Sequence, residues 1–250
     1  MTEDIDFRAL KEEARRLTRT ASVPPLRFTL LYFAVRIALS EAGAAANYLL
    51  VGRSAAEDAV ALPISFPGVL ASLVGSVLLA GYACYALGVQ EGRAMPYGSL
   101  FRAFPFAGHV VLLQVLTGLL IGLGLTFFVV PGIVLAMTYA LSTLHLCEAP
   151  DMGAIAAMRA SREEMRGRKW QLFLLLLSFW PLLLAAGAAI TVFDFFLLDY
   201  FPYTLGGELL STLCYGVLTA CAQLYLTPYL NLTLAAYYRR VKKGDSYGLE

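Results

Sequence analysis

The feature that most constrains the fold of this chain is a series of apolar runs, each about 20 residues long. A helix of that length crosses the roughly 30 Å hydrocarbon core of a bilayer. Of the 250 residues, 59% are hydrophobic and 15% are charged, against about 45–50% and about 25% in soluble domains. The sequence therefore predicts an all-α membrane protein, a bundle of about six transmembrane helices. The predicted spans are residues 28–51, 68–89, 109–130, 133–147, 170–193 and 209–238.

Two of these regions have a second interpretation. Residues 28–51 could be a signal peptide with a cleavage site near the alanines at 44–46, but Arg36 interrupts the apolar core, which favours a membrane span. Residues 109–147 could be one long broken span. A single straight helix of that length would measure roughly 58 Å, so we favour two spans that reverse or kink at Pro131-Gly132.

The distribution of basic residues predicts an orientation. All but two of the 19 Lys and Arg residues lie before the first span, in the connectors 90–108 and 151–169, or after residue 238, the exceptions being Arg36 and Arg53. The positive-inside rule places both termini and these connectors in the cytoplasm. Because the cations form short collars beside apolar runs rather than one patch, nucleic acid is not an expected partner.

Composition divides the chain into three segments. Residues 1–27 are charged and predict an amphipathic helix in the inner membrane interface, with a solvated helical tail as the alternative. Residues 28–238 form one transmembrane domain that includes a cytoplasmic helix at 151–167, and residues 239–250 are a basic cytoplasmic tail. The apolar stripe of the N-terminal helix consists of Phe7, Leu10, Ala14 and Leu17.

A basic collar precedes the fifth predicted span, and an apolar run begins abruptly after it at Trp170. Cations followed by a Trp are typical of a cytoplasmic segment that enters a bilayer. The expected partners of this face are therefore membrane lipids, with another membrane protein or an ATPase as further candidates. The collar consists of Arg159, Arg162, Arg166, Arg168 and Lys169.

Polar side chains inside the spans are the candidates for an intramembrane pathway. Charges at membrane depth are rare and face the bundle interior or water, whereas amides also serve as hydrogen bonds between helices. Arg36 and Glu41 are five residues apart, about 140° around one helix, so we expect each to find its partner on another helix. The candidates are Arg36, Glu41, Gln114, Gln223 and Asn231.

Residue patterns typical of catalysis are missing from the sequence, so we predict a non-enzymatic protein that needs no cofactor. His145 and Glu148 are three residues apart and share a helix face. A metal site needs more ligands, and the other histidine is His109, so we predict interfacial hydrogen bonding and no metal. The four cysteines form no CxxC pair, and we interpret them as small buried residues; they are Cys84, Cys147, Cys214 and Cys221.

Several motifs together resemble a known family. An Arg-Phe pair precedes the first span, a Pro-Gly pair follows an apolar run, and Gly-x-Lys-Trp-x-x-Phe precedes Leu-Ser-Phe. These motifs are carried by Arg27, Phe28, Pro131, Gly132, Ala157, Ser161, Met165, Gly167, Lys169, Trp170, Phe173, Leu177, Ser178, Phe179, Pro228, Tyr229, Tyr237 and Tyr238. In them the chain resembles the bacterial integral membrane proteins of domain of unknown function 975, and it departs at Trp180-Pro181, where that pattern has a Gly before the Trp. The resemblance implies a multi-pass bacterial inner-membrane protein and no established activity.

Three functions remain open on the sequence. The leading hypothesis is a non-enzymatic accessory module that binds lipid, a peptide or another membrane protein. The alternative is a transporter or the permease subunit of an exporter, because six spans with a cytoplasmic helix that could dock an ATPase also describe such subunits. A membrane enzyme acting on lipids is the third, and the sequence lacks the polar cluster that it needs. The substrate and the oligomeric state are not determined by the sequence.

Overall fold

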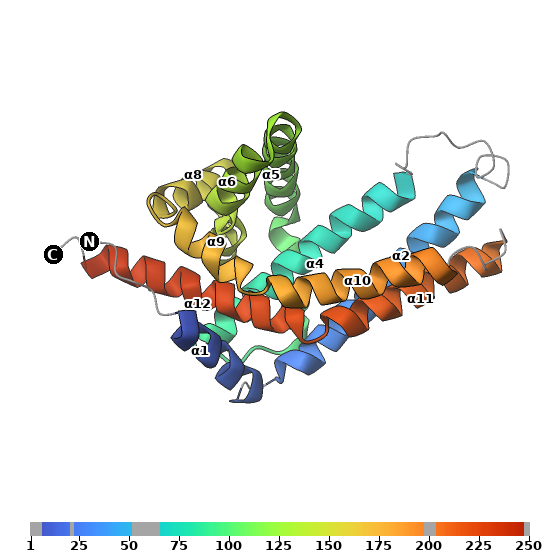
Figure 1. Ribbon diagram of the computed structural model, residues 1–250, viewed down its shortest axis with the longest axis horizontal. Helices are drawn as coiled ribbons and strands as arrows, with labels where there is room; N and C mark the ends of the chain where they lie inside the picture. Colours follow the sequence, from blue (N-terminus) through green and yellow to red (C-terminus); the bar gives the residue numbers. More distant parts are fainter. Residues whose placement is uncertain (1–6, 21–22, 52–65, 198–203, 248–250) are drawn as a thin grey trace. The chain divides into compact units, whose positions relative to one another are not determined.

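The computed structural model describes residues 7–20, 23–51, 66–197 and 204–247 (Figure 1). All regular secondary structure in this part is helical, which confirms the predicted fold class. Arg53, which enters the orientation prediction, lies outside the described residues. The helices are α1 (Phe7–Thr20), α2 (Pro25–Val51), α4 (Phe66–Gln90), η1 (Tyr97–Phe101), η2 (Phe104–Phe106), α5 (Ala107–Phe127), α6 (Val129–Tyr139), α7 (Ser142–Glu148), α8 (Ala154–Glu164), α9 (Lys169–Leu177), α10 (Trp180–Leu197), α11 (Leu205–Gln223) and α12 (Leu226–Tyr247).

The number of membrane-crossing helices agrees with the prediction of about six. Within the described ranges, 5 segments are long and apolar enough to span a bilayer, and a sixth is counted when α9 and α10 are taken together as one broken span. The five are Pro25–Leu49, Phe66–Gln90, Tyr97–Phe127, Val129–Glu148 and Leu205–Gln223.

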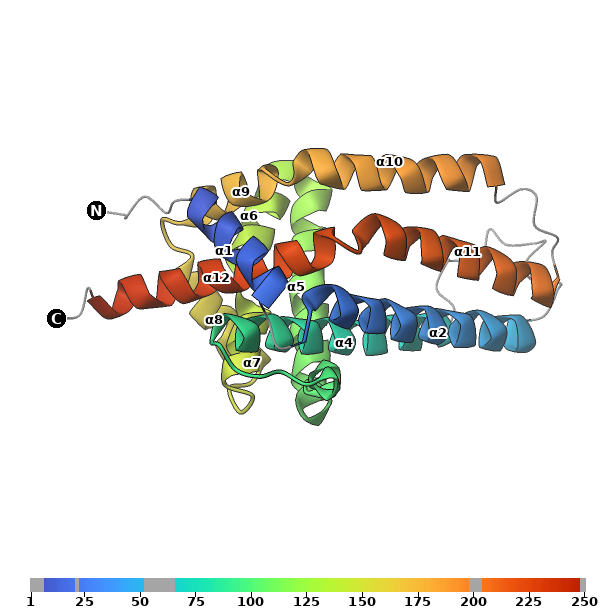
Figure 2. The same ribbon diagram turned by 90° about the horizontal axis from the view of Figure 1, so that it is seen from below.

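The helices group into two compact units. Unit 1 contains Met1–Pro25, Ser76–Trp180 and Pro228–Glu250, and unit 2 contains Leu26–Gly75 and Pro181–Thr227. Within unit 2, α2 packs against α4 and α11, and Figure 2 shows α2, α10 and α11 running in nearly parallel directions.

The C-terminal half of α4 is the centre of unit 1, where every residue from Ala80 to Gln90 is buried. One side of this segment packs with α7, α9 and α12 through residues that include Leu87, Leu172 and Tyr237. The other core cluster joins the same helix to α5, α7 and α8. The apolar side chains of these five helices thus cover this half of α4 with protein.

The amphipathic helix α1 belongs to unit 1. Leu10 and Ala14, two members of its predicted apolar stripe, are completely buried. Lys11 lies over the ring of Phe179, with Nζ 4.7 Å from the ring centroid. Burial lowers the pKa of Lys11, and the nearby charge of Arg15 lowers it further. The apolar stripe therefore packs α1 against the rest of unit 1.

Prolines mark where helices begin. The first turn of a helix tolerates proline because its N–H groups have no intrahelical partner. The reversal expected at Pro131-Gly132 is therefore displaced, because the chain reverses at Phe128 between α5 and α6. The last predicted span, 209–238, is broken after Gln223, between α11 and α12. The prolines in first turns are Pro25, Pro67, Pro131, Pro181 and Pro228.

α5 and α6 form an antiparallel hairpin (Figure 1). Phe128 makes the reversal in an extended conformation, with φ −158° and ψ 144°. The two helices approach closely where glycines face each other. A Cβ added to Gly124 would lie only 2.9 Å from the Cα of Gly132. Residues 109–147 are thus two spans rather than one. Gly118 and Gly122 form a GxxxG pattern in α5, and a Cβ on either would have no described neighbour within 4 Å.

Candidate functional site

A polar junction joins α7, α8 and α12 within unit 1. The Nε2 of His145 lies 3.0 Å from Oε2 of Glu164. The hydroxyl of Tyr238 lies 3.2 Å from Nδ1 of His145 and donates to Oε2 of Glu148. The Nζ of Lys242 lies 2.5 Å from Oε1 of Glu148. Five side chains therefore form one continuous chain of hydrogen bonds.

The groups of this polar junction satisfy one another. A tyrosine hydroxyl has one proton, and that of Tyr238 goes to Glu148, while its oxygen faces Nδ1 of His145 at 3.2 Å. Nε2 of His145 faces the carboxylate of Glu164, and Lys242 faces the other oxygen of Glu148.

The prediction for His145 and Glu148 was hydrogen bonding rather than metal binding. Both side chains bond to Tyr238. Among the described residues, no group of three or more His, Cys, Asp or Glu side chains could hold a metal ion. The chemistry that this arrangement supports is structural: it fixes three helices to one another at the predicted cytoplasmic end of unit 1.

The basic residues at the end of α12 form contacts that join helices within unit 1. Arg239 donates to the carbonyl of Gln90, one of the last carbonyls of α4, which has no partner inside its helix. The guanidinium of Arg240 lies 3.7 Å from the carboxylate of Glu13, which ties α12 to α1. Lys242 completes the polar junction. These cations, which belong to the predicted basic tail, are used inside the unit.

The predicted collar divides into two parts. Arg159, Arg162 and Arg166 are exposed, and their guanidinium groups form no ion pair or hydrogen bond with any described residue. Arg168 and Lys169 are half-buried, and the carbonyl of Arg168 accepts a hydrogen bond from the hydroxyl of Tyr237 at 3.4 Å. Three of the five collar residues therefore leave their charge available to an outside partner.

α8 holds these arginines in place. Its inner face is buried, and Ser161 donates to the carbonyl of Thr138 at 2.8 Å. Ile155 is 56% exposed and lies on the outer side of α8. Ala156 and Glu163 are exposed as well. Ile155 and three exposed arginines recur at intervals of four, three and four, the spacing of one side of a helix, with Arg166 just after the last turn of α8. We call this surface the α8 stripe; it consists of Ile155, Arg159, Arg162 and Arg166.

The intramembrane candidates are not brought together. Gln114 and Asn231 belong to unit 1, and the other three belong to unit 2. Arg36 is exposed and donates to the hydroxyl of Tyr32 at 3.4 Å, so its partner lies on its own helix rather than on another. The Oε1 of Glu41 is covered and has no hydrogen-bond partner among described groups. Neither unit joins these residues, Gln223 included, into a common polar pathway.

Cys84 of α4 and Cys147 of α7 form a disulfide, with their Cα atoms 5.1 Å apart. The interpretation of all four cysteines as small buried residues did not include this pairing. Cys214 and Cys221 are free. The disulfide joins two helices of unit 1 at the ends that the orientation prediction places towards the cytoplasm.

This pair tests the orientation. Cytoplasmic thiols are kept reduced, so we expect Cys84 and Cys147 to be free thiols in acid-quenched cells and to join when an oxidant is added. The bond should then raise the free energy of unfolding by about 2–4 kcal/mol. The intact mass after alkylation counts the free thiols of Cys84 and Cys147, and Cys214 and Cys221 are internal standards that should be alkylated in every sample. A disulfide in untreated cells would contradict the cytoplasmic placement.

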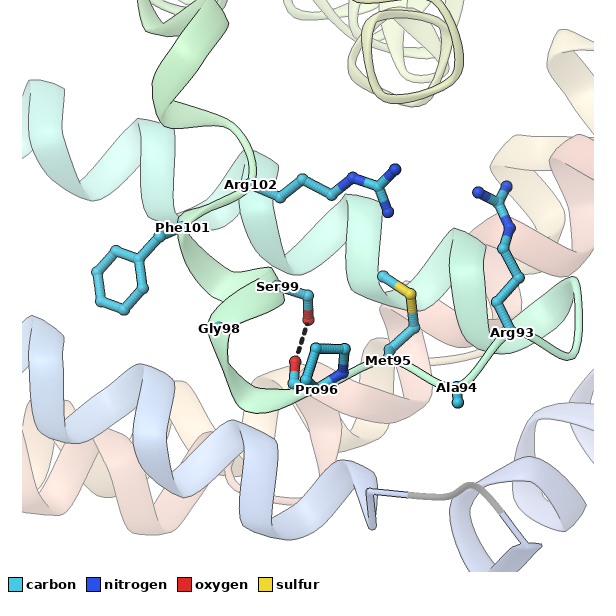
Figure 3. Close-up of a pocket in the computed structure, with 8 residues that line it drawn as sticks. All are labelled: Arg93, Ala94, Met95, Pro96, Gly98, Ser99, Phe101 and Arg102. Carbon is cyan, nitrogen blue, oxygen red and sulfur yellow. Dashed lines mark hydrogen bonds between the residues drawn. The ribbon is translucent and has the colours of Figure 1, made fainter.

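The connector between α4 and α5 forms a pocket of about 480 Å³, lined by residues between Arg93 and Arg102 (Figure 3). α4 ends in a Schellman motif: Gly92 has φ +73°, its N–H donates to Val89 at 3.1 Å, and the N–H of Arg93 donates to Gly88 at 2.9 Å. In Figure 3 the side chains of Arg93 and Arg102 project to the same open side. The sequence marks both as basic connector residues but contains no sign of a pocket.

These observations define a multi-pass α-helical membrane protein whose polar groups hold together the end that the orientation prediction places in the cytoplasm. The family described as Protein of unknown function (DUF975) matches residues 125–245. This match confirms the resemblance expected from the sequence: over residues 125–245 the chain is similar to the DUF975 family, and its curated relatives are named membrane proteins.

The chain is similar to several curated bacterial proteins over part of its length. A UPF0259 membrane protein of Sodalis glossinidius (strain morsitans) is 39% identical over 112 residues, which are 43% of this chain and 44% of that protein. A UPF0259 membrane protein of Yersinia pestis (strain Pestoides F) is 33% identical over 109 residues, 43% of this chain and 42% of the relative. The chain thus spans less than half the length of the curated relatives it matches. No solved structure matches the chain.

Proposed function

We propose that the protein is a non-enzymatic membrane module that binds anionic lipid at its cytoplasmic face through the α8 stripe. The observation that supports this is the unpaired state of Arg159, Arg162 and Arg166 on the outside of a helix whose other side is packed into unit 1. Arginine near an anionic leaflet contributes roughly 1 kcal/mol per residue. The exposed side chain of Ile155 adds apolar contact at one end of the stripe.

The remaining polar groups of unit 1 favour binding over catalysis. In the polar junction each ionisable group is used by another, from Glu164 through His145 and Tyr238 to Lys242. A catalytic acid, base or nucleophile needs access to a substrate. The α8 stripe is a set of charged groups that is held by the fold and open to a ligand.

The test is native mass spectrometry of the protein in a mild detergent, with phosphatidylglycerol or phosphatidylethanolamine added. We expect retention of phosphatidylglycerol, and about 100-fold weaker binding after Arg159, Arg162 and Arg166 are all changed to Gln, at roughly 1 kcal/mol each. The triple Arg→Lys variant keeps the charge and the positive-inside signal, so it should retain the lipid.

Two outcomes would overturn this proposal. Equal phosphatidylglycerol binding by the wild type and the triple Gln variant would remove the α8 stripe from lipid recognition. A stoichiometric protein that co-purifies in place of lipid, above all an ATPase, would support the exporter permease instead. The melting temperature of each variant in detergent verifies that the protein remains folded during the comparison.

A further inference from the structure

The connector pocket is built on a backbone that packs directly against α4. A Cβ on Gly81 would lie 1.9 Å from the carbonyl oxygen of Leu100, and a Cβ on Gly88 would lie 2.4 Å from Sδ of Met95. The two glycines are seven residues apart and therefore lie on the same side of the helix. They allow residues 95–100 to lie in van der Waals contact with α4, which fixes the floor of the pocket.

The two ends of the pocket are also fixed. Arg93 is the residue after the positive-φ Gly92 of the Schellman motif, and its N–H is bonded to Gly88. At the other end, the hydroxyl of Ser99 donates to the carbonyl of Pro96 at 2.7 Å, and the N–H of Arg102 donates to Ser99 at 3.1 Å. Both arginines therefore start from backbone positions that hydrogen bonds hold in place.

The charges at the pocket are unequal. Arg93 forms an ion pair with Glu91, whereas the guanidinium of Arg102 has no ion-pair or hydrogen-bond partner in the described part of the chain. Two guanidinium groups and one carboxylate leave a net charge of about +1 at neutral pH, because Arg stays protonated and Glu ionised. This charge suits a monoanion better than a dianion.

We infer that this pocket binds a monoanionic phosphate group, held by the guanidinium groups of Arg93 and Arg102 above the side chain of Met95. Arginine binds phosphate oxygens with pairs of N–H donors. Figure 3 shows the two guanidinium groups on the same side of the pocket, with Met95 between them. The phosphodiester of a lipid headgroup and free dihydrogen phosphate share this chemistry. The pocket lies on a different segment from the α8 stripe, so the inference does not depend on the function proposed for that surface.

The inference is tested by titrating the full-length protein in detergent with dihexanoyl phosphatidylglycerol, kept monomeric, and separately with inorganic phosphate near pH 6. Calorimetry measures both affinities. Tighter binding of the short-chain lipid assigns the site to a headgroup, and equal or tighter binding of phosphate assigns it to the free ion. Both results support a phosphate site, whereas saturation by neither probe overturns it.

Three variants make the test specific. Arg102→Gln should weaken binding about 10- to 100-fold, because it removes charge-assisted hydrogen bonds, and Arg102→Lys should fall between this variant and the wild type. Glu91→Gln frees Arg93 and raises the net charge, so it should tighten binding about threefold or more. Unchanged affinity in Arg102→Gln, or weaker binding in Glu91→Gln, overturns the inference.

The triple Gln variant of the α8 stripe separates this inference from the proposed function. It should bind the short-chain lipid in the pocket as the wild type does while losing retained long-chain phosphatidylglycerol. Loss of both in that variant would show that the α8 stripe contains the lipid site and overturn the pocket. Melting temperatures measured without probe verify the fold of every variant, and Arg102→Lys keeps the test decisive if Arg102→Gln does not fold.

Discussion

Replacing Gly81 with alanine is expected to destabilise unit 1 by about 1–3 kcal/mol or more, the cost of overpacking a close contact. The new methyl group would lie 1.9 Å from the carbonyl oxygen of Leu100, a distance that requires the backbone of the connector to move. Thermal unfolding in detergent should show an apparent midpoint about 2–12 °C lower, at about 2–4 °C per kcal/mol for a chain of this size.

Gly75 is the matched control on the same helix. A Cβ there would meet no described atom within 4 Å, so Gly75→Ala should be neutral or stabilise by up to about 1 kcal/mol, because alanine favours helix over glycine. The two substitutions are chemically identical and should differ in sign. Equal effects would show that the connector does not pack against Gly81. The argument that this packing fixes the floor of the connector pocket would then fail.

Replacing Tyr238 with phenylalanine is expected to destabilise unit 1 by about 1–3 kcal/mol, the cost of leaving buried polar partners unsatisfied. The change removes one oxygen atom, which lies 3.2 Å from Nδ1 of His145 and donates to Glu148. The ring stays, so its burial is unchanged. Chemical or thermal unfolding in detergent, followed by tryptophan fluorescence, measures the difference.

The neighbouring Tyr237 is the control for this change. Both rings are buried, with Tyr237 0% and Tyr238 1% exposed. The hydroxyl of Tyr237 makes one long hydrogen bond of 3.4 Å to the carbonyl of Arg168, so Tyr237→Phe should cost clearly less, below about 1 kcal/mol. A larger effect at Tyr237 than at Tyr238 would contradict the hydrogen-bond network described for the polar junction.

The two candidate ligand surfaces, the α8 stripe and the connector pocket, differ in shape and therefore in how selectively each can bind a ligand. The α8 stripe is a convex helix face, where charge and local lipid concentration decide binding. The connector pocket is concave and fixed by backbone packing, which allows it to distinguish one phosphate from another. A protein with both would hold annular lipid at one place and a specific anion at the other, both on segments predicted to face the cytoplasm.

The membrane spans could be predicted because the thickness of the bilayer sets their length, and each span appears in the sequence as an apolar run of about 20 residues. The predicted span 68–89 is α4 (Phe66–Gln90), and 28–51 is α2 (Pro25–Val51). The positions of bends were harder to predict. The sequence predicts the reversal at Pro131-Gly132, whereas Pro131 lies inside the first turn of α6, after the break at Phe128.

The roles of polar residues could be predicted only in part. His145 and Glu148 were recognisable as a pair on one helix face, but their common partner Tyr238 is 93 residues from His145 in the chain. The spacing of Tyr238 and Lys242, one helical turn apart beyond an apolar run, is a weak signal that a polar contact follows. It does not say which helix supplies the partner.

The sequence by itself determined the all-helical membrane class, the approximate spans and the residues that carry charge, because these depend on local composition and on the thickness of a bilayer. Only the tertiary structure decided which charges are used. Inside unit 1 it pairs Lys242 with Glu148 and Arg240 with Glu13. It leaves Arg102 and the arginines of the α8 stripe without an ion-pair partner among the described residues. The physical reason is that an ion pair, or a glycine that admits a passing carbonyl, depends on distances between segments far apart in the chain, and those distances exist only after the helices have packed.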